Sequence, residues 1–364
     1  MSALRRLVIN GRFLTGGATA VNTVAHRLTQ ALLDLDQSRF SFEVAVPRGV
    51  EGPQDWPLRT FGRLRGVAWE QFELPRLARR ASVLGFFNTV PLLGQGYVTL
   101  LHDAHVFDTP ESYPMLVRHW RRVLSRRAGA KGRQVLTVSN HARDRLAAVG
   151  IAPADVIYNG ADHLKHQHPD PDILARLDLN RPYFLAVGSS LAHKNTDLLL
   201  RVFATHELNE VPLVLAGGAR PDMFKSPPPN VIWPGFVTDA EMVALYGGAR
   251  GVLMPSRAEG FGLPPVEAMG QGTPSIVAPC GALPEICGPG ALYVAPDDDL
   301  GWQAAILNLL GNDALRANLV SNGRVHIARF TWQASALAVL DALGAGHVNQ
   351  MHRSTRDAPR DIEP

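Results

Sequence analysis

Two glutamates bracket the segment whose residue types are best suited to hold a charged ligand. Residues 255–269 read PSRAEGFGLPPVEAM, which places Glu259 and Glu267 eight positions apart. The double proline inside the segment can lie only at or before the first turn of a helix, because proline lacks the amide donor that later positions need. We therefore expect a helix to begin there, and the amides of Phe261, Gly262 and Leu263 to be free.

Free amides at a helix start, together with the positive end of the helix dipole, bind phosphate-type anions without a metal. Carboxylates repel phosphate, so Glu259 and Glu267 are better placed to accept hydrogen bonds from hydroxyl groups on either side of it. A ligand with hydroxyls, then a diphosphate, then further hydroxyls is a sugar nucleotide.

The Glu-x7-Glu pattern around Glu-Gly-Phe-Gly-Leu-Pro resembles the donor-binding motif of retaining glycosyltransferases of family 4. That resemblance implies a GT-B architecture, with Glu259 on the transferred sugar, Glu267 on the nucleotide ribose and the turn from Gly260 to Leu263 on the donor. The alternative is that Glu259 is an ordinary loop charge and Glu267 a solvated helix residue.

A second loop resembles the same family. Residues 187–195 (VGSSLAHKN) follow a predicted strand and precede a predicted helix, so Lys194 should project into a cleft. The resemblance implies that Lys194 neutralises the donor diphosphate and that Gly188, Ser189 and His193 also border the donor; an ordinary surface lysine is the alternative. The family often has arginine at the position of His193, and a mostly neutral imidazole cannot make the same bidentate contact. Arg257 is a candidate to supply the missing charge.

His102 and Asp103 follow a buried strand in the first half of the chain, and they resemble the His-Asp pair of the family. With residues 107–113 (FDTPESY), the segment is similar to bacterial exopolysaccharide mannosyltransferases. The resemblance places His102 near the reacting centre. Asp103 has two open interpretations, an acceptor contact or a local cap.

The early glycine-rich loop resembles the family segment that approaches donor and acceptor, which implies donor contacts for Gly16 and Gly17 and an acceptor contact for Thr19. Relatives commonly have glycine where this chain has Ala20. Residues 235–239 (GFVTD) resemble the loop beside the nucleotide base, with Val237 in contact. There, capping of a helix by Thr238 or Asp239 is an equal alternative.

Length and composition indicate a globular protein with two domains. The chain has 364 residues, 46% of them hydrophobic and 7% aromatic. No apolar run is long enough to cross a membrane, and residues 1–9 are typical of a first strand rather than a signal peptide, so we expect a cytoplasmic protein. Cys280 and Cys287 have no accompanying histidine cluster, which makes structural zinc and a disulfide unlikely interpretations.

The first half of the chain is basic, with 21 Lys or Arg against 11 Asp or Glu in residues 1–150, although the net charge of the whole chain is only +3. Five arginines lie on a predicted helix beside Trp120, Val123 and Leu124; they are Arg118, Arg121, Arg122, Arg126 and Arg127. Such a helix can rest on an anionic membrane or simply be solvated on one face. Nucleic acid binding has no supporting motif.

Short apolar runs alternate with helical patterns in both halves, which predicts an α/β fold with two doubly wound, Rossmann-like domains facing across a cleft. The expected strands are 7–9, 42–46, 83–87, 97–101, 134–138, 183–187, 213–216, 231–233, 251–254 and 274–278. We expect an acceptor-binding domain over residues 1–168 and a nucleotide-sugar domain over 169–330. A helix over 331–346 should cross back to the first domain, and residues 347–364 are predicted to be a disordered tail.

Cleavage of a sugar–diphosphate bond leaves negative charge on the departing phosphate, which Lys194 and the amides of Phe261 and Gly262 could stabilise. No Asp-x-Asp metal motif stands at a convincing position, so we expect turnover without a metal or other cofactor. The resemblance implies a retaining transferase, with His102, Lys194 and Glu259 at the reacting centre.

The preferred reaction moves mannose from GDP-mannose to a polyprenyl-diphosphate-linked or other saccharide acceptor. Three alternatives remain: a UDP- or dTDP-sugar donor, a GT-B sugar-nucleotide epimerase, and a degenerate subunit that supports an active partner.

Overall fold

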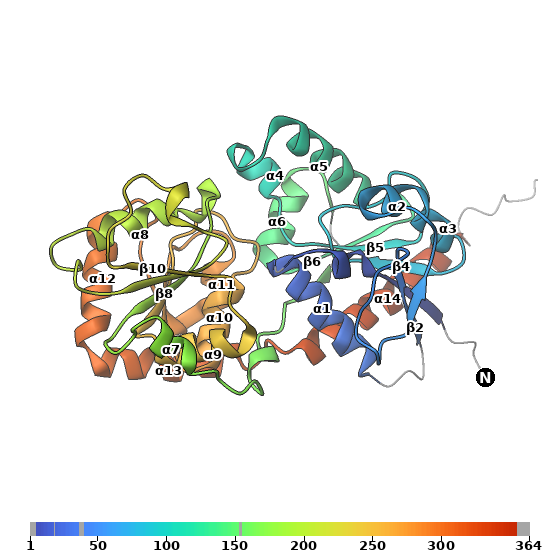
Figure 1. The fold of residues 1–364 in the computed structure, drawn as a ribbon. Helices are drawn as coiled ribbons and strands as arrows, with labels where there is room; N and C mark the ends of the chain where they lie inside the picture. The colour runs from blue at the N-terminus through green and yellow to red at the C-terminus, as the bar shows by residue number, and fades with distance from the viewer. Residues whose placement is uncertain (1–4, 18, 36–39, 153–154, 355–364) are drawn as a thin grey trace, which may run out of the picture.

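The computed structural model describes residues 5–17, 19–35, 40–152 and 155–354, with side chains up to residue 344. Two lobes lie side by side, each built on its own twisted sheet (Figure 1). The chain passes from the first lobe to the second near residue 160 and returns near residue 330. This arrangement confirms the expected two α/β domains, which both have wholly parallel sheets within the described residues.

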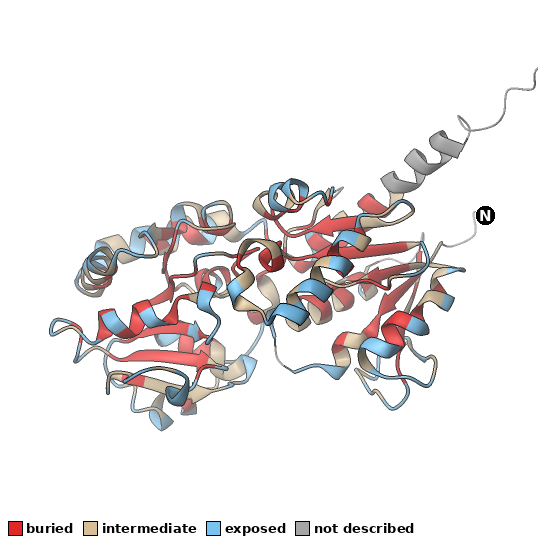
Figure 2. Ribbon diagram, turned by 90° about the horizontal axis from the view of Figure 1, so that it is seen from above, coloured by how far each residue is buried: buried red, intermediate tan, exposed pale blue. Residues whose placement is uncertain are grey.

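The N-terminal sheet has the strand order β3-β2-β1-β4-β5-β6-β7 in the described residues. Its strands are β1 (Arg5–Asn10), β2 (Phe40–Val46), β3 (Leu58–Thr60), β4 (Ser82–Gly85), β5 (Tyr97–Leu101), β6 (Gln134–Thr137) and β7 (Asp155–Val156). Helices cover both faces of this sheet. The central strands therefore carry mainly apolar side chains on both faces, which is typical of buried parallel strands. Figure 2 shows these strands as a buried layer between the helices.

The helices of this domain connect successive strands. They are α1 (Ala20–Leu33), α2 (Gly66–Phe72), α3 (Leu74–Ala78), α4 (His105–Asp108), α5 (Met115–Ala128) and α6 (Asn140–Ala148), with the short 3-10 helices η1 (Gly11–Thr15) and η2 (Pro110–Ser112). α1 shows why the sequence folds this way: the Thr19 hydroxyl accepts a hydrogen bond from the amide of Asn22, and Val24, Leu28 and Leu32 recur at helical spacing on the buried face.

The C-terminal sheet has the order β10-β9-β8-β11-β12-β13 in the described residues. Its strands are β8 (Phe184–Gly188), β9 (Leu213–Gly217), β10 (Val231–Gly235), β11 (Gly251–Met254), β12 (Ser275–Val277) and β13 (Ala291–Tyr293). Its helices are α7 (Asp172–Arg176), α8 (Thr196–Phe203), α9 (Asp239–Gly248), α10 (Leu263–Gly270), α11 (Leu283–Cys287), α12 (Asp299–Gly311) and α13 (Asp313–Ile327), with η4 (Ala192–Lys194), η5 (Pro221–Met223) and η6 (Gly288–Gly290).

Strand order reverses beside β8 and β11, since β9 and β10 lie on one side of this pair and β12 and β13 on the other. Ligands of open parallel sheets bind beyond the carboxyl ends of the strands at such a switch point. The loops that follow β8 and β11 carry Lys194 and Glu259, so the fold itself brings the two sequence motifs together.

The first crossing occurs earlier than residue 168. η3 (Asp162–Leu164) packs against α9 and α10, and Leu164 is part of the C-terminal hydrophobic core, because its side chain is covered by that domain. The return crossing leads into α14 (Trp332–Ser354), which packs on α1 of the N-terminal domain. The helical backbone thus continues to Ser354, past the expected end at residue 346, and residues 355–364 lie outside the described residues.

One hydrophobic cluster spans both domains. The N-terminal core residues Leu7 and Phe86 belong to the same cluster as Phe261 and Val266 of the C-terminal domain. Trp332, the first residue of α14, is also part of this cluster. The domains therefore meet through apolar packing as well as polar contacts. Among the described helices, each is either too short or too polar to span a bilayer.

Candidate functional site

The loop after β11 turns sharply into α10. Gly262 caps the helix with φ 98°, a left-handed conformation that favours glycine, and Pro264 and Pro265 occupy the first turn, as the sequence predicted. A side chain at Gly262 would also lie 2.5 Å from Cδ2 of Leu283. The helix begins at Leu263, so the amide of Leu263 has no intrahelical partner, while Pro264 and Pro265 have no amide hydrogen to satisfy.

Lys194 and Glu259 are in direct contact at this helix start. Nζ of Lys194 donates to Oε1 of Glu259 over 2.7 Å, and the side chains are 27% and 7% exposed, respectively. Burial alone would raise the pKa of Glu259, yet the charge and hydrogen bond of Lys194, with a further hydrogen bond from Ser256, lower it below its ordinary value. Glu259 is therefore an ionised acceptor at neutral pH, and it is paired with the partly exposed ammonium group of Lys194.

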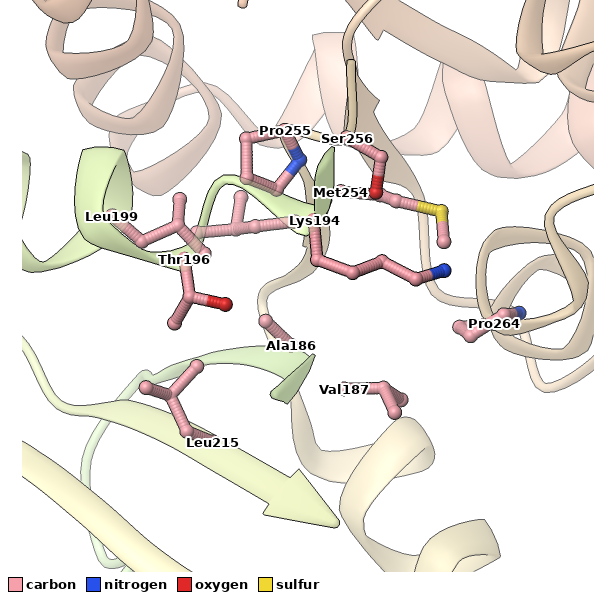
Figure 3. A pocket seen from close by; sticks show the side chains of 11 residues that line it. Ala186, Val187, Lys194, Thr196, Leu199, Leu215, Met254, Pro255, Ser256 and Pro264 are labelled. Atoms are coloured by element: carbon pink, nitrogen blue, oxygen red, sulfur yellow. The ribbon is translucent and has the colours of Figure 1, made fainter. Parts of the chain in front are cut away.

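A small pocket of about 20 Å³, room for about one water molecule, lies beside Lys194 (Figure 3). Lys194 extends past Met254 toward Pro264, so its ammonium group lies at the start of α10. The pocket is lined by Ala186, Val187, Lys194, Thr196, Leu199, Leu215, Leu253, Met254, Pro255, Ser256 and Pro264. Lys194 and the first turn of α10 thus line one pocket at the topological switch point, and Lys194 links that pocket to the carboxylate of Glu259.

The loop that carries Lys194 is held by its neighbours. The side chain of Asn195, which has φ 56°, donates to the carbonyl oxygens of Pro255 and Pro296. The hydroxyl of Ser189 accepts from the amide of Leu191, and Gly188 packs so closely on Ala219 that an added Cβ would lie 2.7 Å from the Ala219 Cβ. These two predicted donor residues shape the loop, and the structure gives them no further assignment.

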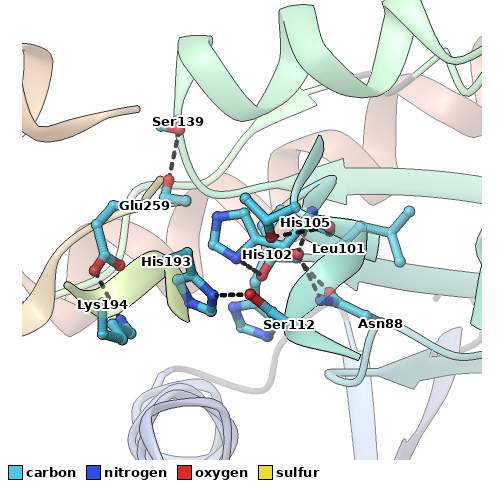
Figure 4. A network of polar contacts seen from close by, with 12 residues as sticks. Asn88, Leu101, His102, His105, Ser112, Ser139, His193, Lys194 and Glu259 are labelled. Atoms are coloured by element: carbon cyan, nitrogen blue, oxygen red, sulfur yellow. Dashed lines mark hydrogen bonds and ion pairs between the residues drawn. The ribbon is translucent and has the colours of Figure 1, made fainter. Parts of the chain in front are cut away.

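His193 lies in the domain interface. Its Nδ1 is 2.9 Å from Oγ of Ser112, and its ring centroid is 5.0 Å from that of His105, both in the N-terminal domain (Figure 4). Burial, followed by the charges of His105 and Lys194, lowers the pKa of His193 to about 4, so the ring is neutral at pH 7. The ring is engaged with the other domain rather than directed as a cation at the pocket. Arg257, the candidate substitute, approaches Oδ1 of Asn195 at 3.4 Å.

His102 is buried at the carboxyl end of β5. Its Nε2 donates to the carbonyl oxygen of Phe86 over 2.7 Å, which leaves Nδ1 as the acceptor. Burial lowers the pKa of the imidazole, so it is neutral. The His102 carbonyl oxygen faces Gly260 across the domain boundary, at 2.0 Å from the position that an added Cβ would take. The structure therefore brings His102 next to the turn after Glu259.

Asp103 acts as a local cap. Its Oδ1 accepts from the amide of His105 over 3.0 Å and from Nδ2 of Asn88 over 3.2 Å, while Oδ2 lies 3.5 Å from Nδ1 of His105. Of the two interpretations from sequence, this geometry matches the cap. The acceptor role remains a prediction.

Glu267 is the fifth of the eight residues of α10, and its side chain is 12% exposed. Its Oε2 accepts from the hydroxyl of Tyr246 over 2.9 Å, and its Oε1 lies 3.3 Å from Nε2 of His163. The carboxylate is thus held by two neighbours at the first crossing. The predicted ribose contact requires it to accept from a ligand as well, which a carboxylate with two oxygens can do.

The remaining predicted residues lie just before α1 and α9. Gly16, Gly17 and Thr19 are exposed before α1, where Thr19 caps the helix and the Gly17 carbonyl accepts from Nδ2 of Asn22. Val237 is half-buried before α9. Thr238 forms a full capping box with Glu241, which supports the capping alternative for that loop.

Polar contacts across the domain boundary were missed by sequence reasoning. Glu285 of α11 accepts from the amides of Asn140 and His141 at the start of α6 and from the hydroxyl of Tyr158. The Ser139 hydroxyl donates to the carbonyl oxygen of Gly260 over 2.7 Å. In the sequence, these contacts are indicated only by a serine before a helix and a glutamate in the first turn of another. Neither residue type indicates which distant segment it contacts.

Comparisons with known proteins match both halves of the chain. The family model described as "Glycosyl transferases group 1" matches residues 175–326, and the model described as "Glycosyltransferase Family 4" matches residues 16–164. The O-antigen chain mannosyltransferase RfbU of Salmonella typhimurium is 30% identical over 266 residues, covering 68% of this chain and 72% of the relative. The chain belongs to glycosyltransferase family 4.

Other relatives and solved structures agree with that assignment. O-antigen chain mannosyltransferase B of Escherichia coli is 27% identical over 270 residues, covering 67% of this chain and 69% of that protein. A sucrose-phosphate synthase from Thermosynechococcus elongatus has a TM-score of 0.70 at 19% identity, covering 98% of this chain and 100% of that chain. WaaG, a glycosyltransferase involved in lipopolysaccharide biosynthesis, has a TM-score of 0.69 at 15% identity, covering 93% and 99%. These structures establish the GT-B fold.

This family 4 glycosyltransferase is an enzyme that depends on a nucleotide sugar. Lys194 and Pro264 line the pocket at the start of α10, and Glu259 is in contact with Lys194. Within the described residues, no three His, Cys, Asp or Glu side chains form a group that could hold a metal ion.

Proposed function

We propose that this glycosyltransferase moves mannose from GDP-mannose to a polyprenyl-diphosphate-linked oligosaccharide, in the synthesis of exopolysaccharide or lipopolysaccharide. The observation that carries the proposal is the Lys194–Glu259 pair at the start of α10. The choice of mannose is supported by two relatives that are O-antigen chain mannosyltransferases.

In the proposed reaction the bond between the anomeric carbon and the diphosphate oxygen breaks, and an acceptor hydroxyl bonds to the same face of the carbon. The acceptor proton passes to an oxygen of the departing diphosphate. Lys194 and the amides of Phe261 and Gly262 stabilise the negative charge that grows on the diphosphate, which is the usual largest contribution to catalysis. Glu259 orients the hexose through its hydroxyls, and His102 lies against the sugar. These groups supply the charge without a metal or other cofactor.

Transfer assays test this proposal. Purified protein is incubated with GDP-mannose, UDP-glucose or dTDP-glucose, each with and without a lipid extract containing polyprenyl-diphosphate oligosaccharides, and each with excess EDTA. We expect mannose transfer that depends on the acceptor, is strongest with GDP-mannose and persists in EDTA.

The other outcomes point to the alternatives. Preference for a UDP- or dTDP-sugar would replace the donor, and turnover of the donor without an acceptor would indicate an epimerase or hydrolase. No turnover with any donor would favour a non-catalytic subunit. Loss of activity in EDTA would contradict the metal-independent mechanism.

We further propose that the enzyme binds peripherally to the inner face of the plasma membrane through its N-terminal domain. α5 exposes an apolar stripe in which Met115 is 71% and Leu116 83% exposed, followed by Trp120 and Val123 at 41% and 39%. Leu124, which the sequence grouped with them, is buried and anchors the helix. Exposed apolar side chains of this size are typical of interaction surfaces.

The apolar surface continues beyond α5. Arg127 of α5 donates to the carbonyl oxygen of Leu92, whose amide donates to Oε1 of Gln71 in α2, so the loop with Leu93 links the two helices. Leu93 is 69% and Phe72 of α2 is 67% exposed. The arginines of α5 flank this surface, and charge of that sign is complementary to anionic lipid. α5 lies beside α4 at the rim of the gap between the domains, which would direct the cleft toward a lipid-linked acceptor (Figure 1).

Vesicle sedimentation with Leu116→Asp measures this contact. Removing one buried leucine from a bilayer costs about 1.5–3 kcal/mol, so we expect at least about a tenfold weaker partition into phosphatidylglycerol vesicles. The matched control is Leu300→Asp, because Leu300 is 77% exposed on α12 of the other domain. Equal binding by the two variants, or equal binding of the wild type to phosphatidylcholine vesicles, would contradict the proposed surface or its charge dependence.

A further inference from the structure

His193 occupies a position that couples the two domains. Its carbonyl oxygen accepts from the amide of Arg257 over 2.7 Å, which ties the loop after β8 to the loop that carries Glu259. Its ring contacts Ser112 and His105 of the N-terminal domain. The next residue is Lys194, which pairs with Glu259. His193 therefore connects the loop of the Lys194–Glu259 pair to the N-terminal domain (Figure 4).

The N-terminal side of this contact is itself organised. His105 is 11% exposed on its side chain and lies beside Asp103, which is fixed by Asn88. Ser112 belongs to η2, which follows α4 directly. In Figure 1, α4 lies at the upper rim of the gap, whereas the two chain crossings lie at its lower end. The contact is thus placed far from the crossings, where a rotation of one domain against the other separates atoms most.

The two domains meet through apolar packing near the crossings and through polar contacts, and domains joined within one chain can rotate relative to each other about such a boundary. We propose that His193 is a positioning residue: its contact with Ser112 holds the domains closed over the donor pocket and keeps Lys194 beside Glu259. The inference rests on the proposed function for its kinetic consequence. It assigns to Nδ1 of His193 a role other than that of a ligand for donor phosphate, because that nitrogen is already engaged by Ser112.

Kinetic variants separate these two roles. Ser112→Ala and His193→Phe each remove the polar contact and keep most of the packing, so each should lower kcat about fivefold to tenfold with the KM for the donor changed less than twofold. The double variant should be no slower than the slower single variant, because both changes remove the same contact. The matched control is Ser321→Ala, an exposed serine on α13, which should behave as the wild type.

His193→Arg gives the sharpest contrast. A guanidinium placed in the buried site beside His105 should separate the domains and lower kcat about tenfold or more. If His193 instead serves the donor phosphate, this variant should keep wild-type kcat and lower the KM for the donor, which would overturn the proposal. Wild-type kinetics in Ser112→Ala would overturn it as well.

Hydrogen exchange provides a readout that does not need turnover. Ser112→Ala should speed amide exchange in the segments 105–112 and 189–195, without change in α13. If the wild type transfers no sugar but these segments respond, the proposed function fails and the domain contact stands. If the wild type transfers sugar and these segments do not respond, the domain contact fails and the function stands.

Discussion

Replacing Gly260 with alanine is expected to lower kcat about hundredfold while the isolated fold of each domain is retained. The Cβ of alanine would lie 2.0 Å from the carbonyl oxygen of His102 and 3.0 Å from its carbonyl carbon, so the two backbones must separate. A displacement of about 1 Å between catalytic groups can cost about a hundredfold in rate. The backbone of Gly260, the residue after Glu259, contacts the backbone of His102. The added methyl group would push these two segments apart.

The measurement is steady-state transfer, combined with small-angle scattering to detect a more open molecule. Gly247→Ala is the matched control, since Gly247 lies in α9 and an added Cβ there has no atom within 4 Å. It should leave kcat unchanged and stabilise the helix by up to about 1 kcal/mol. A Gly260→Ala enzyme with wild-type kcat would show that contact between these backbones is not part of the active arrangement.

Replacing Lys194 with alanine is expected to lower kcat at least about tenfold, which corresponds to about 1.4 kcal/mol of transition-state stabilisation. The departing diphosphate loses its cation, and Glu259, which is 7% exposed, loses the partner that keeps it ionised. Glu259→Ala should cost at least as much, because the hexose loses its acceptor. The two changes should be strongly non-additive, since the side chains are in contact at 2.7 Å.

Lys225→Ala is the control for the charge, because Lys225 is an exposed lysine of the same domain. Thermal unfolding of all four variants separates loss of catalysis from loss of folding. If Lys194→Ala or Glu259→Ala retains near-normal kcat in a folded protein, that residue does not belong to the reacting centre.

Much of the fold could be predicted because the central strands are short, mostly apolar runs between turn residues. The missed strands were β3, β7 and β13, which have two or three residues and lie at the edges of the sheets; β3 and β7 also carry polar side chains. Such strands form because a neighbouring strand offers unpaired backbone groups. A pattern of apolar residues cannot be recognised over only two or three positions, so the sequence does not predict these strands. The helix was expected to end at residue 346 because the residues that follow are polar and charged, whereas the helical backbone continues to Ser354.

The candidate site divides in the same way. Glu259, Gly262 and the double proline lie within a single turn and helix start, so their local conformation follows from residue type. The capping role of Thr238 could also be predicted locally, because its partner Glu241 is three residues away in the same helix. By contrast, the interpretation of His193 as a donor ligand was carried over from a resemblance, and its ring lies against Ser112, which is 81 positions away in the sequence.

The sequence by itself determined the chemistry that this protein brings to its cleft: a helix start with free amides, a lysine and two carboxylates, each placed by backbone rules that act over a few neighbouring residues. Only the tertiary structure decided which of these groups touch. Lys194 meets Glu259, His193 meets Ser112 and Gly260 meets His102 because two sheets bring their loops to one boundary. Those contacts depend on the packing of whole domains, for which no short segment carries the information.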